Sequence, residues 1–390
     1  MHPAEKIKGI KSNLLLNKKI ILGVTGSIAA EETVKLAREL IRYGADVQAV
    51  MTESAKKIIT VDSLKFATGT DVIDYISGGV EHVDLLDRAD LLLIAPCSVN
   101  TLSKIATGIA DSTVSLFAAT ALGSLKILIA PAMHDKMYNN PVIKNNVKAL
   151  ERYGLLFVPP KIQENKAKMA DVETIVAYVI RTLNEDYKNK KVLVIGGGSV
   201  EHIDDVRTIS NLSTGETALE LAKNAFYLGA DVTLLIGTYS VSIPPYIKTE
   251  HFDSVSTLIA DIPKMLGYDY ILVPAALSDF TVEKSAGKIS SDKSLNLELV
   301  PNPKFILSLR NKYKNVLVGF KAEYGISDEL LLKKGQEKLK KYNLEFLIAN
   351  DLKKVKEGYT EILFIEKNNY KKLSGSKSDV TLQILKMILR

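Results

Sequence analysis

The sequence predicts an α/β protein made of two doubly wound parallel-sheet domains. Three observations over its 390 residues support this fold class. Short apolar runs alternate with helical patterns along the whole chain, which is typical of β-α-β units. Each half opens alike, with Lys-Lys before a strand that ends in glycine, at residues 18–26 and 190–198. The motif Gly-Ala-Asp-Val also occurs in both halves, beginning at Gly44 and at Gly229.

The predicted strands are the apolar runs, which are continuous because both faces of a parallel sheet are buried. In the first half they are residues 20–24, 47–51, 91–95 and 127–130. In the second half they are residues 192–195, 232–236, 270–273, 316–319 and 346–349. The glycine of each Gly-Ala-Asp-Val motif is expected to end a helix, and the residues after it to start the next strand.

The polar segment at residues 184–190 is the expected boundary between a first domain, residues 1–184, and a second, residues 185–390. From Ile20 to Gly44 there are 24 residues, whereas from Val192 to Gly229 there are 37. The second half therefore carries 13 additional residues, at the carboxyl end of its first strand. Because open α/β sheets bind ligands at that edge, residues 204–215 are expected to form a binding loop.

Composition and charge exclude several classes of function. The longest charge-free stretch, residues 232–247, is too short for a membrane helix and is interrupted by two prolines. The net charge of +6 is spread along the chain without aromatic clustering, which argues against nucleic-acid binding. The single cysteine, Cys97, excludes an internal disulfide, and the first 20 residues lack the pattern of a secretory signal. A cytoplasmic protein is therefore expected.

Small and polar residues follow several strands of the first half. Gly26 and Ser27 lie between the first strand and its helix, where backbone N–H groups and a hydroxyl could hold a phosphate. A tight turn with an N-cap serine would have the same sequence. Two further strands are followed by residues 95–101 and 131–137, which place polar residues at the same sheet edge.

Together these segments resemble the flavoproteins that decarboxylate C-terminal or pantothenoyl cysteine. The resemblance implies an FMN site formed by Gly26, Ser27, Thr52, Ser98, Asn100, Thr101 and Met133. It also implies that His82 is catalytic, because that family has its catalytic histidine just before a strand like residues 90–96. An isolated histidine at a helix start is more often a solvated or capping residue.

Two departures from this family concern the last chemical step. The asparagine that contacts the substrate carboxylate in the family is His134 here, which is a candidate catalytic residue. The flexible flap with Cys-Gly-Asp is missing, and only residues 169–170 match its trailing end. That flap cysteine normally helps to protonate the reduced product, so the proton donor is left open between Lys166, Lys168 and His134. We expect Cys97 to be buried after its strand and to serve packing.

Six segments of the second half resemble the phosphopantothenate–cysteine ligase domain: residues 204–215, 275–280, 287–289, 302–303, 319–323 and 349–351. The resemblance implies a nucleotide site formed by Gly197, Gly198, Ala275, Ala276, Asp279, Lys288, Asn302, Phe320 and Lys321. Its chemistry requires a nucleotide phosphate to be neutralised beside the substrate carboxylate, and Lys288 is the candidate cation. The amide of Asn211 could hold the acyl phosphate during amine attack. A helix-capping Asn211 and a solvated Lys288 are the alternatives.

Both resemblances occur in this order in the bifunctional coenzyme A biosynthesis family. This implies ligation of 4'-phosphopantothenate to cysteine through an acyl-cytidylate, with CTP and Mg2+, and then FMN-dependent decarboxylation to 4'-phosphopantetheine. It also implies a homo-oligomer, a dodecamer built from trimers and dimers. The alternative is a ligase fused to a catalytically inactive flavodomain that serves oligomerisation or regulation.

Overall fold

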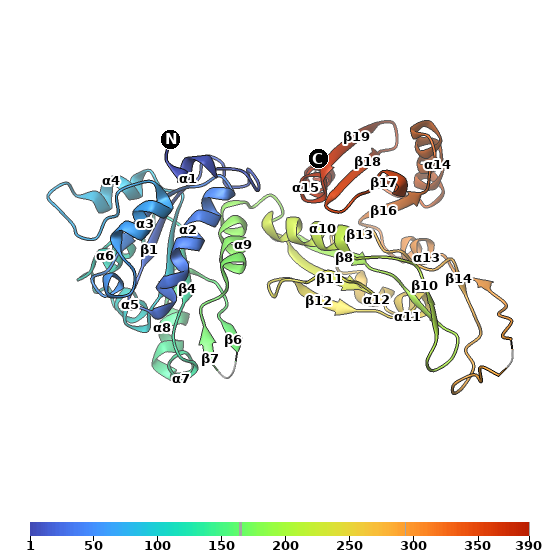
Figure 1. Ribbon diagram of the computed structural model, residues 1–390, viewed down its shortest axis with the longest axis horizontal. Helices are drawn as coiled ribbons and strands as arrows, with labels where there is room; N and C mark the ends of the chain where they lie inside the picture. Colours follow the sequence, from blue (N-terminus) through green and yellow to red (C-terminus); the bar gives the residue numbers. More distant parts are fainter. Residues whose placement is uncertain (164–165, 293, 390) are drawn as a thin grey trace. The chain divides into compact units, whose positions relative to one another are not determined.

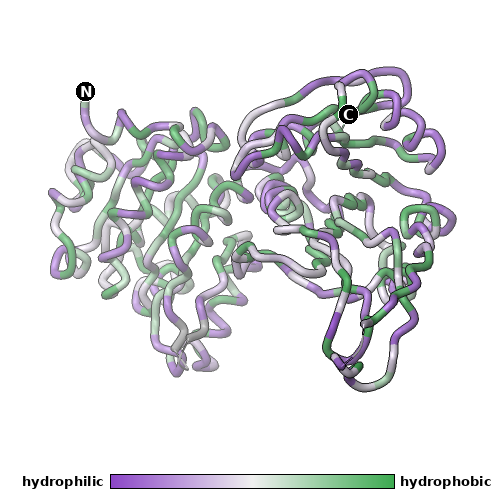
Figure 2. The backbone as a smooth tube through the Cα atoms, turned by 45° about the vertical axis from the view of Figure 1, so that its right-hand side comes forward, coloured by the Kyte–Doolittle hydropathy of each residue, from purple (hydrophilic) through white to green (hydrophobic). Residues whose placement is uncertain are grey.

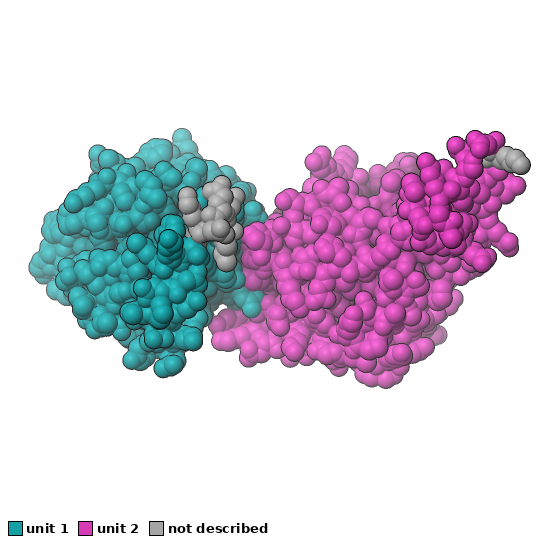
Figure 3. Space-filling view, turned by 90° about the horizontal axis from the view of Figure 1, so that it is seen from below, with its two compact units in different colours: residues 1–184 teal, residues 185–390 magenta. Residues whose placement is uncertain are grey.

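The computed structural model describes residues 1–163, 166–292 and 294–389. The chain divides into two compact units, Met1–Asn184 and Glu185–Arg390, which are coloured separately in Figure 3. Each unit is an α/β fold around its own central sheet, which confirms the predicted fold class. All nine predicted runs lie within strands. Figure 2 shows the resulting alternation of hydrophobic and hydrophilic stretches along the chain.

The first unit contains a parallel sheet in the order β2-β1-β3-β4-β5, of which β1 and β4 are labelled in Figure 1. Its strands are β1 Lys19–Val24, β2 Asp46–Met51, β3 Leu91–Cys97, β4 Ile127–Pro131 and β5 Leu156–Phe157. The central strands are buried on both faces, as their continuous apolar sequences predict. A small antiparallel hairpin, β6 Lys161–Gln163 and β7 Lys166–Lys168, follows the sheet.

Helices cover both faces of this sheet. One face is packed against α4 Glu81–Asp87, α5 Val99–Ala106, α6 Thr113–Ala121 and α8 Pro141–Arg152. The neighbouring helices α2 Thr33–Arg42 and α9 Val172–Leu183 lie together on the other face. The remaining helices are α1 Pro3–Lys6, η1 Ile28–Glu32, η2 Ala55–Lys57, α3 Val61–Thr68 and α7 Asp135–Tyr138.

The second unit contains a larger sheet in the order β12-β11-β8-β13-β16-β17-β18-β19. Its parallel strands are β8 Lys191–Gly196, β11 Asp231–Ile236, β12 Lys248–His251, β13 Tyr270–Val273, β16 Val316–Glu323 and β17 Phe346–Asp351. Two antiparallel strands, β18 Tyr359–Ile365 and β19 Tyr370–Ser376, extend it, so the sheet is mixed rather than purely parallel. Short antiparallel pairs are formed by β9 Val200–His202 with β10 Thr208–Ser210, and by β14 Phe280–Thr281 with β15 Val300–Pro301.

The helices of the second unit also lie on both faces of its sheet. The core of one face is formed with α11 Val255–Ala260, α12 Ile262–Met265, α13 Phe305–Lys312 and α14 Asp328–Lys341. The helices α10 Glu216–Tyr227 and α15 Lys377–Ile388 pack against each other and cover the other face. A short helix, η3 Leu352–Lys354, follows β17.

The repeated Gly-Ala-Asp-Val motif has the predicted role in both units. Gly44 has a φ of 101° and Gly229 a φ of 96°, a left-handed region that favours glycine after a helix. The next residues begin β2 and β11. Both halves therefore share the same helix-to-strand connection. Among the described residues, no helix is long and apolar enough to cross a lipid bilayer.

Candidate active sites

Thr25 connects the carboxyl ends of β1 and β3, although no motif singles it out. Its buried hydroxyl donates to the carbonyl of Pro96 at 2.8 Å and accepts from the backbone N–H of Ser98 at 2.9 Å. The turn that carries Gly26 and Ser27 is thereby fixed against the loop after β3. A threonine directly after a buried parallel strand was the available sequence signal.

Gly26 packs closely against the loop after β2. A Cβ at this position would lie 2.5 Å from the Cβ of Ser54, so the approach requires glycine. The Thr52 hydroxyl lies 3.2 Å from the Ser54 hydroxyl. Ser98 caps α5 by accepting from the backbone N–H of Thr101 at 3.3 Å. The structure therefore brings the predicted flavin residues after β1, β2 and β3 to one edge of the sheet.

Two cavities open beside these loops. The His134 cavity has a volume of about 690 Å³ and is lined by residues that include Ser27, Ile28, Met133, His134, Lys161 and Lys168. The Asn100 cavity has a volume of about 590 Å³ and is lined by residues that include Thr52, Ser54, Asn100, Thr101, Lys104 and Asp111. The predicted flavin residues are thus divided between two cavities, and Gly26 and Ser98 line neither.

The start of η1 offers hydrogen-bond donors to the His134 cavity. Ser27 is the N-cap residue of this helix, but its hydroxyl makes no capping hydrogen bond. The first backbone N–H groups of a helix lack intrahelical acceptors, and Ile28 and Ala29 line the cavity. This combination of a hydroxyl and helix N-terminal amides suits a phosphate group.

His134 begins α7 and lines the same cavity. Its Nδ1 accepts a hydrogen bond from the backbone N–H of Lys136 at 3.2 Å. A neutral imidazole that accepts at Nδ1 carries its proton on Nε2, so His134 can offer one N–H donor, as an asparagine amide does. Lys161 and Lys168 are paired across the β6–β7 hairpin and also line the cavity. The side chain of Lys166 lies outside the described residues.

His82 lies in the first turn of α4 and lines neither cavity. Its ring packs edge-on against Phe117 of α6, with centroids 6.4 Å apart. Its Nδ1 is buried and has no hydrogen-bond partner in the described part of the chain. Buried polar atoms usually have hydrogen-bond partners, so a group outside the described residues would have to supply one for this Nδ1. The catalytic role of His82 stays a prediction.

Cys97 has the buried position that the sequence predicted. It ends β3 and is fully buried in the core of the first unit. Burial raises the pKa of its thiol to about 12. The thiol is therefore protonated near neutral pH and serves packing, which makes it an unsuitable replacement for a flap cysteine.

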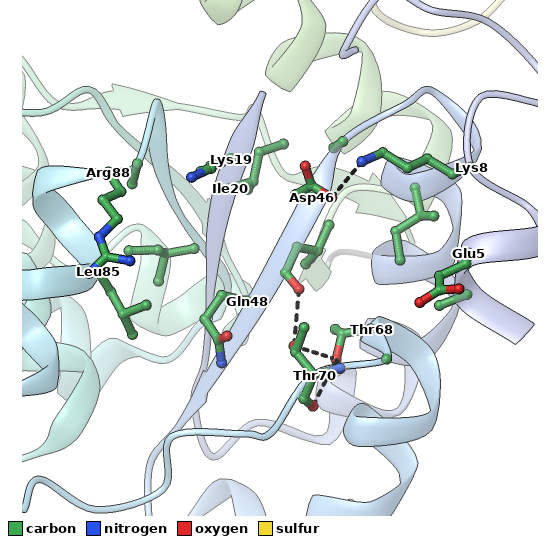
Figure 4. A pocket seen from close by; sticks show the side chains of 17 residues that line it. Glu5, Lys8, Lys19, Ile20, Asp46, Gln48, Thr68, Thr70, Leu85 and Arg88 are labelled. Atoms are coloured by element: carbon green, nitrogen blue, oxygen red, sulfur yellow. Dashed lines mark hydrogen bonds and ion pairs between the residues drawn. The ribbon is translucent and has the colours of Figure 1, made fainter. Parts of the chain in front are cut away.

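Figure 4 shows another pocket of the first unit, at the amino ends of β1 and β2. Several of its polar side chains already bind one another, including Lys8 with Asp46 at 2.6 Å and Thr70 with Thr68 at 3.1 Å. Ligands of open α/β sheets bind at the opposite edge, at the carboxyl ends of the strands. None of the predicted site residues lines this pocket.

In the second unit, hydrogen bonds join the loops after β8, β10 and β13. The carbonyl of Gly197 accepts from the N–H of Ala276 at 2.8 Å, and the side-chain amide of Asn211 donates to the carbonyl of Leu277 at 3.0 Å. A Cβ at Gly198 would lie 2.9 Å from the carbonyl oxygen of Asn211. Both predicted glycines therefore lie beside Asn211 and the turn after β13 that contains Ala275 and Ala276.

The Asp279 cavity lies next to this turn and has a volume of about 160 Å³. Its lining residues include the predicted Ala275, Asp279 and Phe320, together with Lys304, Lys338 and Tyr342. Asn302 adjoins it, because its N–H donates to the carbonyl of Asp279 at 2.9 Å and its buried amide donates to Ser278 at 3.2 Å. Four predicted nucleotide residues are thus brought together.

The electrostatics of this cavity are dominated by lysines. A hydrogen bond from Lys304 is the main cause of a lowered pKa at Asp279, and Lys338 and Lys321 add to it. Burial lowers the pKa of Lys338, and the nearby Lys321 lowers it further. Several ammonium groups therefore face one carboxylate, which suits an anionic ligand. The motifs missed Lys338, although its spacing from Lys334 on α14 places both on one helix face.

Lys288 is separate from this group in the structure. It lies on the arm between β14 and β15, residues 282–299, and does not line the Asp279 cavity. The predicted Lys321 also lies outside the lining and pairs with Glu323 at 2.9 Å. The predicted binding loop, residues 204–215, contains β10 and Asn211 and leads into α10. The structure therefore joins most, but not all, of the predicted nucleotide residues.

Comparisons with known proteins cover both units. Residues 9–184 match the family described as Flavoprotein, and residues 187–390 match the DNA/pantothenate metabolism flavoprotein C-terminal domain. The Coenzyme A biosynthesis bifunctional protein CoaBC of Methanocaldococcus jannaschii is 42% identical, over 100% of this chain and 97% of that protein. The chain belongs to this bifunctional coenzyme A biosynthesis family. The family member from Thermococcus kodakarensis is 41% identical, over 96% of this chain and 95% of its own length.

Solved structures similar to this chain each cover about half of it. A PPC decarboxylase mutant complexed with pantothenoylaminoethenethiol is 28% identical, covers 42% of this chain and 96% of its own, and has a TM-score of 0.37. The DNA/Pantothenate Metabolism Flavoprotein from Streptococcus pneumoniae is 23% identical, covers 51% of this chain and 98% of its own, and has a TM-score of 0.48.

Proposed function

We propose that this chain performs two consecutive steps of coenzyme A biosynthesis. The second unit joins 4'-phosphopantothenate to cysteine, and the first unit decarboxylates the product to 4'-phosphopantetheine. Family membership over the whole chain supports the pathway. The assignment of the two sites rests on one observation, which is that motif residues lie together at the carboxyl edge of each sheet. Ligands of open α/β folds bind at that edge.

For the ligase, CTP is assigned to the Asp279 cavity. A carboxylate oxygen of 4'-phosphopantothenate attacks the α-phosphorus of CTP, and pyrophosphate leaves. The amine of cysteine then attacks the acyl carbon, and CMP leaves. The ammonium groups of Lys304, Lys321 and Lys338 favour the nucleotide phosphates, while Asn211 is proposed to orient the acyl phosphate. The choice of CTP follows the family, and no residue is assigned to read its base.

Mg2+ is proposed to accompany the nucleotide phosphates, where it neutralises charge on the leaving pyrophosphate. Within the described residues, no cluster of three or more His, Cys, Asp or Glu side chains could hold a metal ion. The proposal therefore assigns Mg2+ to the phosphates of CTP and no set of protein ligands to it.

For the decarboxylase, the residues fit FMN. The Ser27 hydroxyl and the first amides of η1 suit its phosphate, and Thr52, Asn100 and Thr101 lie at the same sheet edge. Bound FMN would supply two-electron oxidation and reduction of the substrate. His134 is proposed to donate its Nε2–H to the substrate carboxylate. Either Lys161 or Lys168 is proposed to deliver the proton that the missing flap cysteine would supply, and His82 is proposed to act in proton removal.

The family resemblance also leads us to propose a homo-oligomer, a dodecamer of trimers and dimers. In the arm between β14 and β15, leucines alternate with polar residues, and Leu295, Leu297 and Leu299 are all exposed. This alternation of residue type is typical of a segment with one apolar face, and exposed apolar side chains favour contact with another chain. The unpartnered His82 Nδ1 is consistent with a neighbouring subunit completing its surroundings. Light scattering on the purified chain tests this assembly.

FMN is expected to copurify with the chain and to give it a yellow colour. The phosphate donors at Ser27 and η1 provide the physical reason. Absorption spectra of the purified chain, and of the same chain after reconstitution with FMN, measure binding. A colourless protein that gains no flavin on reconstitution would contradict the proposed decarboxylase activity. If the flavodomain is catalytically inactive, the protein should have the same yellow colour but should release no carbon dioxide from the substrate.

His134→Asn is expected to keep decarboxylation within about tenfold of the unmodified chain, whereas His134→Ala should lose about 100-fold. Asparagine restores the single N–H donor that the Nδ1-accepting imidazole offers, and alanine removes it. Carbon dioxide release gives the rates. Calorimetry with the unreactive serine analogue of the substrate gives carboxylate binding. Equal losses in both variants would show that His134 acts through acid-base chemistry instead.

A further inference from the structure

The residue before Lys288 is held by Asp205. The N–H of Gly287 donates to the Asp205 carboxylate at 2.8 Å, and the carbonyl of Gly287 accepts from the Asp205 N–H at 3.2 Å. Gly287 has a φ of 70°, a left-handed conformation that favours glycine. Lys284 adds an ion pair with Asp205 at 2.7 Å. This attachment is partly exposed, because 54% of the Asp205 side chain is accessible.

The residue after Lys288 is held by Asp204 and Arg207. The N–H of Ile289 donates to the Asp204 carboxylate at 3.1 Å. The carbonyl of Ile289 accepts from Nη1 of Arg207 at 3.0 Å, and the same Nη1 lies 2.7 Å from the Asp204 carboxylate. Both neighbours of Lys288 therefore have their N–H and C=O groups occupied by one short loop.

Asp204 is the buried centre of this attachment. Its side chain is fully inaccessible, and its other oxygen accepts from the N–H groups of Val206 and Arg207 at 2.7 and 2.6 Å. Burial by itself would raise the pKa of Asp204, but these backbone bonds, with those from Ile289 and the Arg207 side chain, outweigh it and lower the pKa to about 2. Asp204 is therefore ionised at neutral pH, with every acceptor position directed at the backbone or Arg207.

The side chain of Lys288 has a different environment from the backbone groups of the residues on either side of it. Across the described residues, its ammonium group makes no hydrogen bond or ion pair, whereas Lys284 on the same arm is paired. The loop thus fixes the backbone on both sides of Lys288 and leaves its charge unneutralised. A lysine presented in this way is available to an external anion, and little side-chain interaction has to be broken first.

We propose that Asp204 is a positioning residue for the ligase, which acts with Arg207 and Asp205 to hold the Lys288 backbone. The proposal rests on the ligase function proposed above and assigns these residues no contact with the reacting atoms. It explains why an Asp-Asp-Val-Arg segment and a Gly-Lys-Ile segment, about 80 residues apart in the sequence, are present together. The two segments form one hydrogen-bonded unit.

The test is a double-mutant cycle with Asp204→Asn and Lys288→Gln, in the full chain loaded with FMN. Asparagine keeps one oxygen for the turn amides, but its NH2 group replaces the oxygen that accepts from Ile289 and Arg207. Small misplacements of a catalytic group can cost about 100-fold, so Asp204→Asn is expected to slow amide formation about 10- to 100-fold. In the Lys288→Gln background, Asp204→Asn is expected to add less than about twofold.

Two further variants and a second measurement support the cycle. Asp205→Asn should cost less than Asp204→Asn, because its attachment is exposed. Asp253→Asn is the matched control: it removes the same charge from a carboxylate bound to His202 on the adjacent hairpin, at 2.7 Å, and should leave the rate unchanged. Hydrogen exchange should be faster at residues 287–289 in Asp204→Asn.

The proposal is overturned if Asp204→Asn costs the same factor with and without Lys288, if it costs nothing, or if exchange at residues 287–289 is unchanged. A general loss of folding would speed exchange throughout the second unit and also overturns it. If the unmodified chain forms no amide, the ligase function fails instead, and exchange at residues 287–289 alone decides whether Asp204 holds the arm.

Discussion

Replacing His82 by asparagine is expected to slow decarboxylation at least about 100-fold, the typical loss when an acid-base group is removed. Asparagine keeps a polar side chain of similar size but cannot exchange a proton near neutral pH. Flavin should stay bound, because His82 lines neither the His134 cavity nor the Asn100 cavity. The measurements are carbon dioxide release from 4'-phosphopantothenoylcysteine and the flavin absorption of the same sample.

His202→Asn provides the matched control, because it makes the same chemical change at an exposed histidine of the second unit. It should leave decarboxylation unchanged. Unchanged turnover in His82→Asn would instead assign this histidine to packing against Phe117. Loss of flavin together with activity would show that His82 supports the cofactor site rather than the proton transfer.

Lys288→Gln is expected to slow amide formation at least about 100-fold, comparable to the loss of one group that stabilises charge in a transition state. Glutamine keeps most of the side-chain length and can still donate hydrogen bonds, but it removes the positive charge. The backbone attachment through Gly287 and Ile289 should be unaffected, since it uses no Lys288 side-chain atom. The rate is measured by mass spectrometry of quenched mixtures with and without cysteine.

Lys340→Gln is a suitable control, because it removes a lysine from an exposed position of α14. Asn211→Asp gives a useful comparison. A second negative charge beside the acyl phosphate should slow attack by cysteine, so a species with the mass of phosphopantothenoyl-CMP should build up. If Lys288→Gln retains the full rate, the alternative of a solvated lysine is correct, and the cations of the Asp279 cavity carry the reaction.

Strands of the central sheets could be predicted because parallel strands covered on both faces are continuous apolar runs. The antiparallel strand β19 could not be predicted by that criterion, whereas β18 contains the buried apolar run 362–365 and was missed. β19 exposes Tyr370, Lys371 and Lys372, and no helix separates it from β18. The alternation that identifies β-α-β units therefore has no counterpart there. These strands follow hairpin rules and extend the parallel sheet at its edge.

Residues directly after parallel strands, such as Ser27 and Met133, could be placed from sequence because strand ends meet at one edge. Lys338 could not, because its position depends on how α14 packs over the sheet. The sequence also could not predict that Lys288 lies apart from the Asp279 cavity. Its position depends on an arm held by residues about 80 positions earlier in the chain. Long-range packing decides both positions, and local sequence patterns do not encode it.

The most direct test of the central claim is a single coupled reaction. The FMN-loaded chain is incubated with 4'-phosphopantothenate, cysteine, CTP and Mg2+, and all products are quantified by mass spectrometry and carbon dioxide release. The account predicts 4'-phosphopantetheine, carbon dioxide, CMP and pyrophosphate in equal amounts. Accumulation of 4'-phosphopantothenoylcysteine without carbon dioxide would contradict it and indicate an inactive flavodomain, and release of CDP and inorganic phosphate would contradict the acyl-cytidylate.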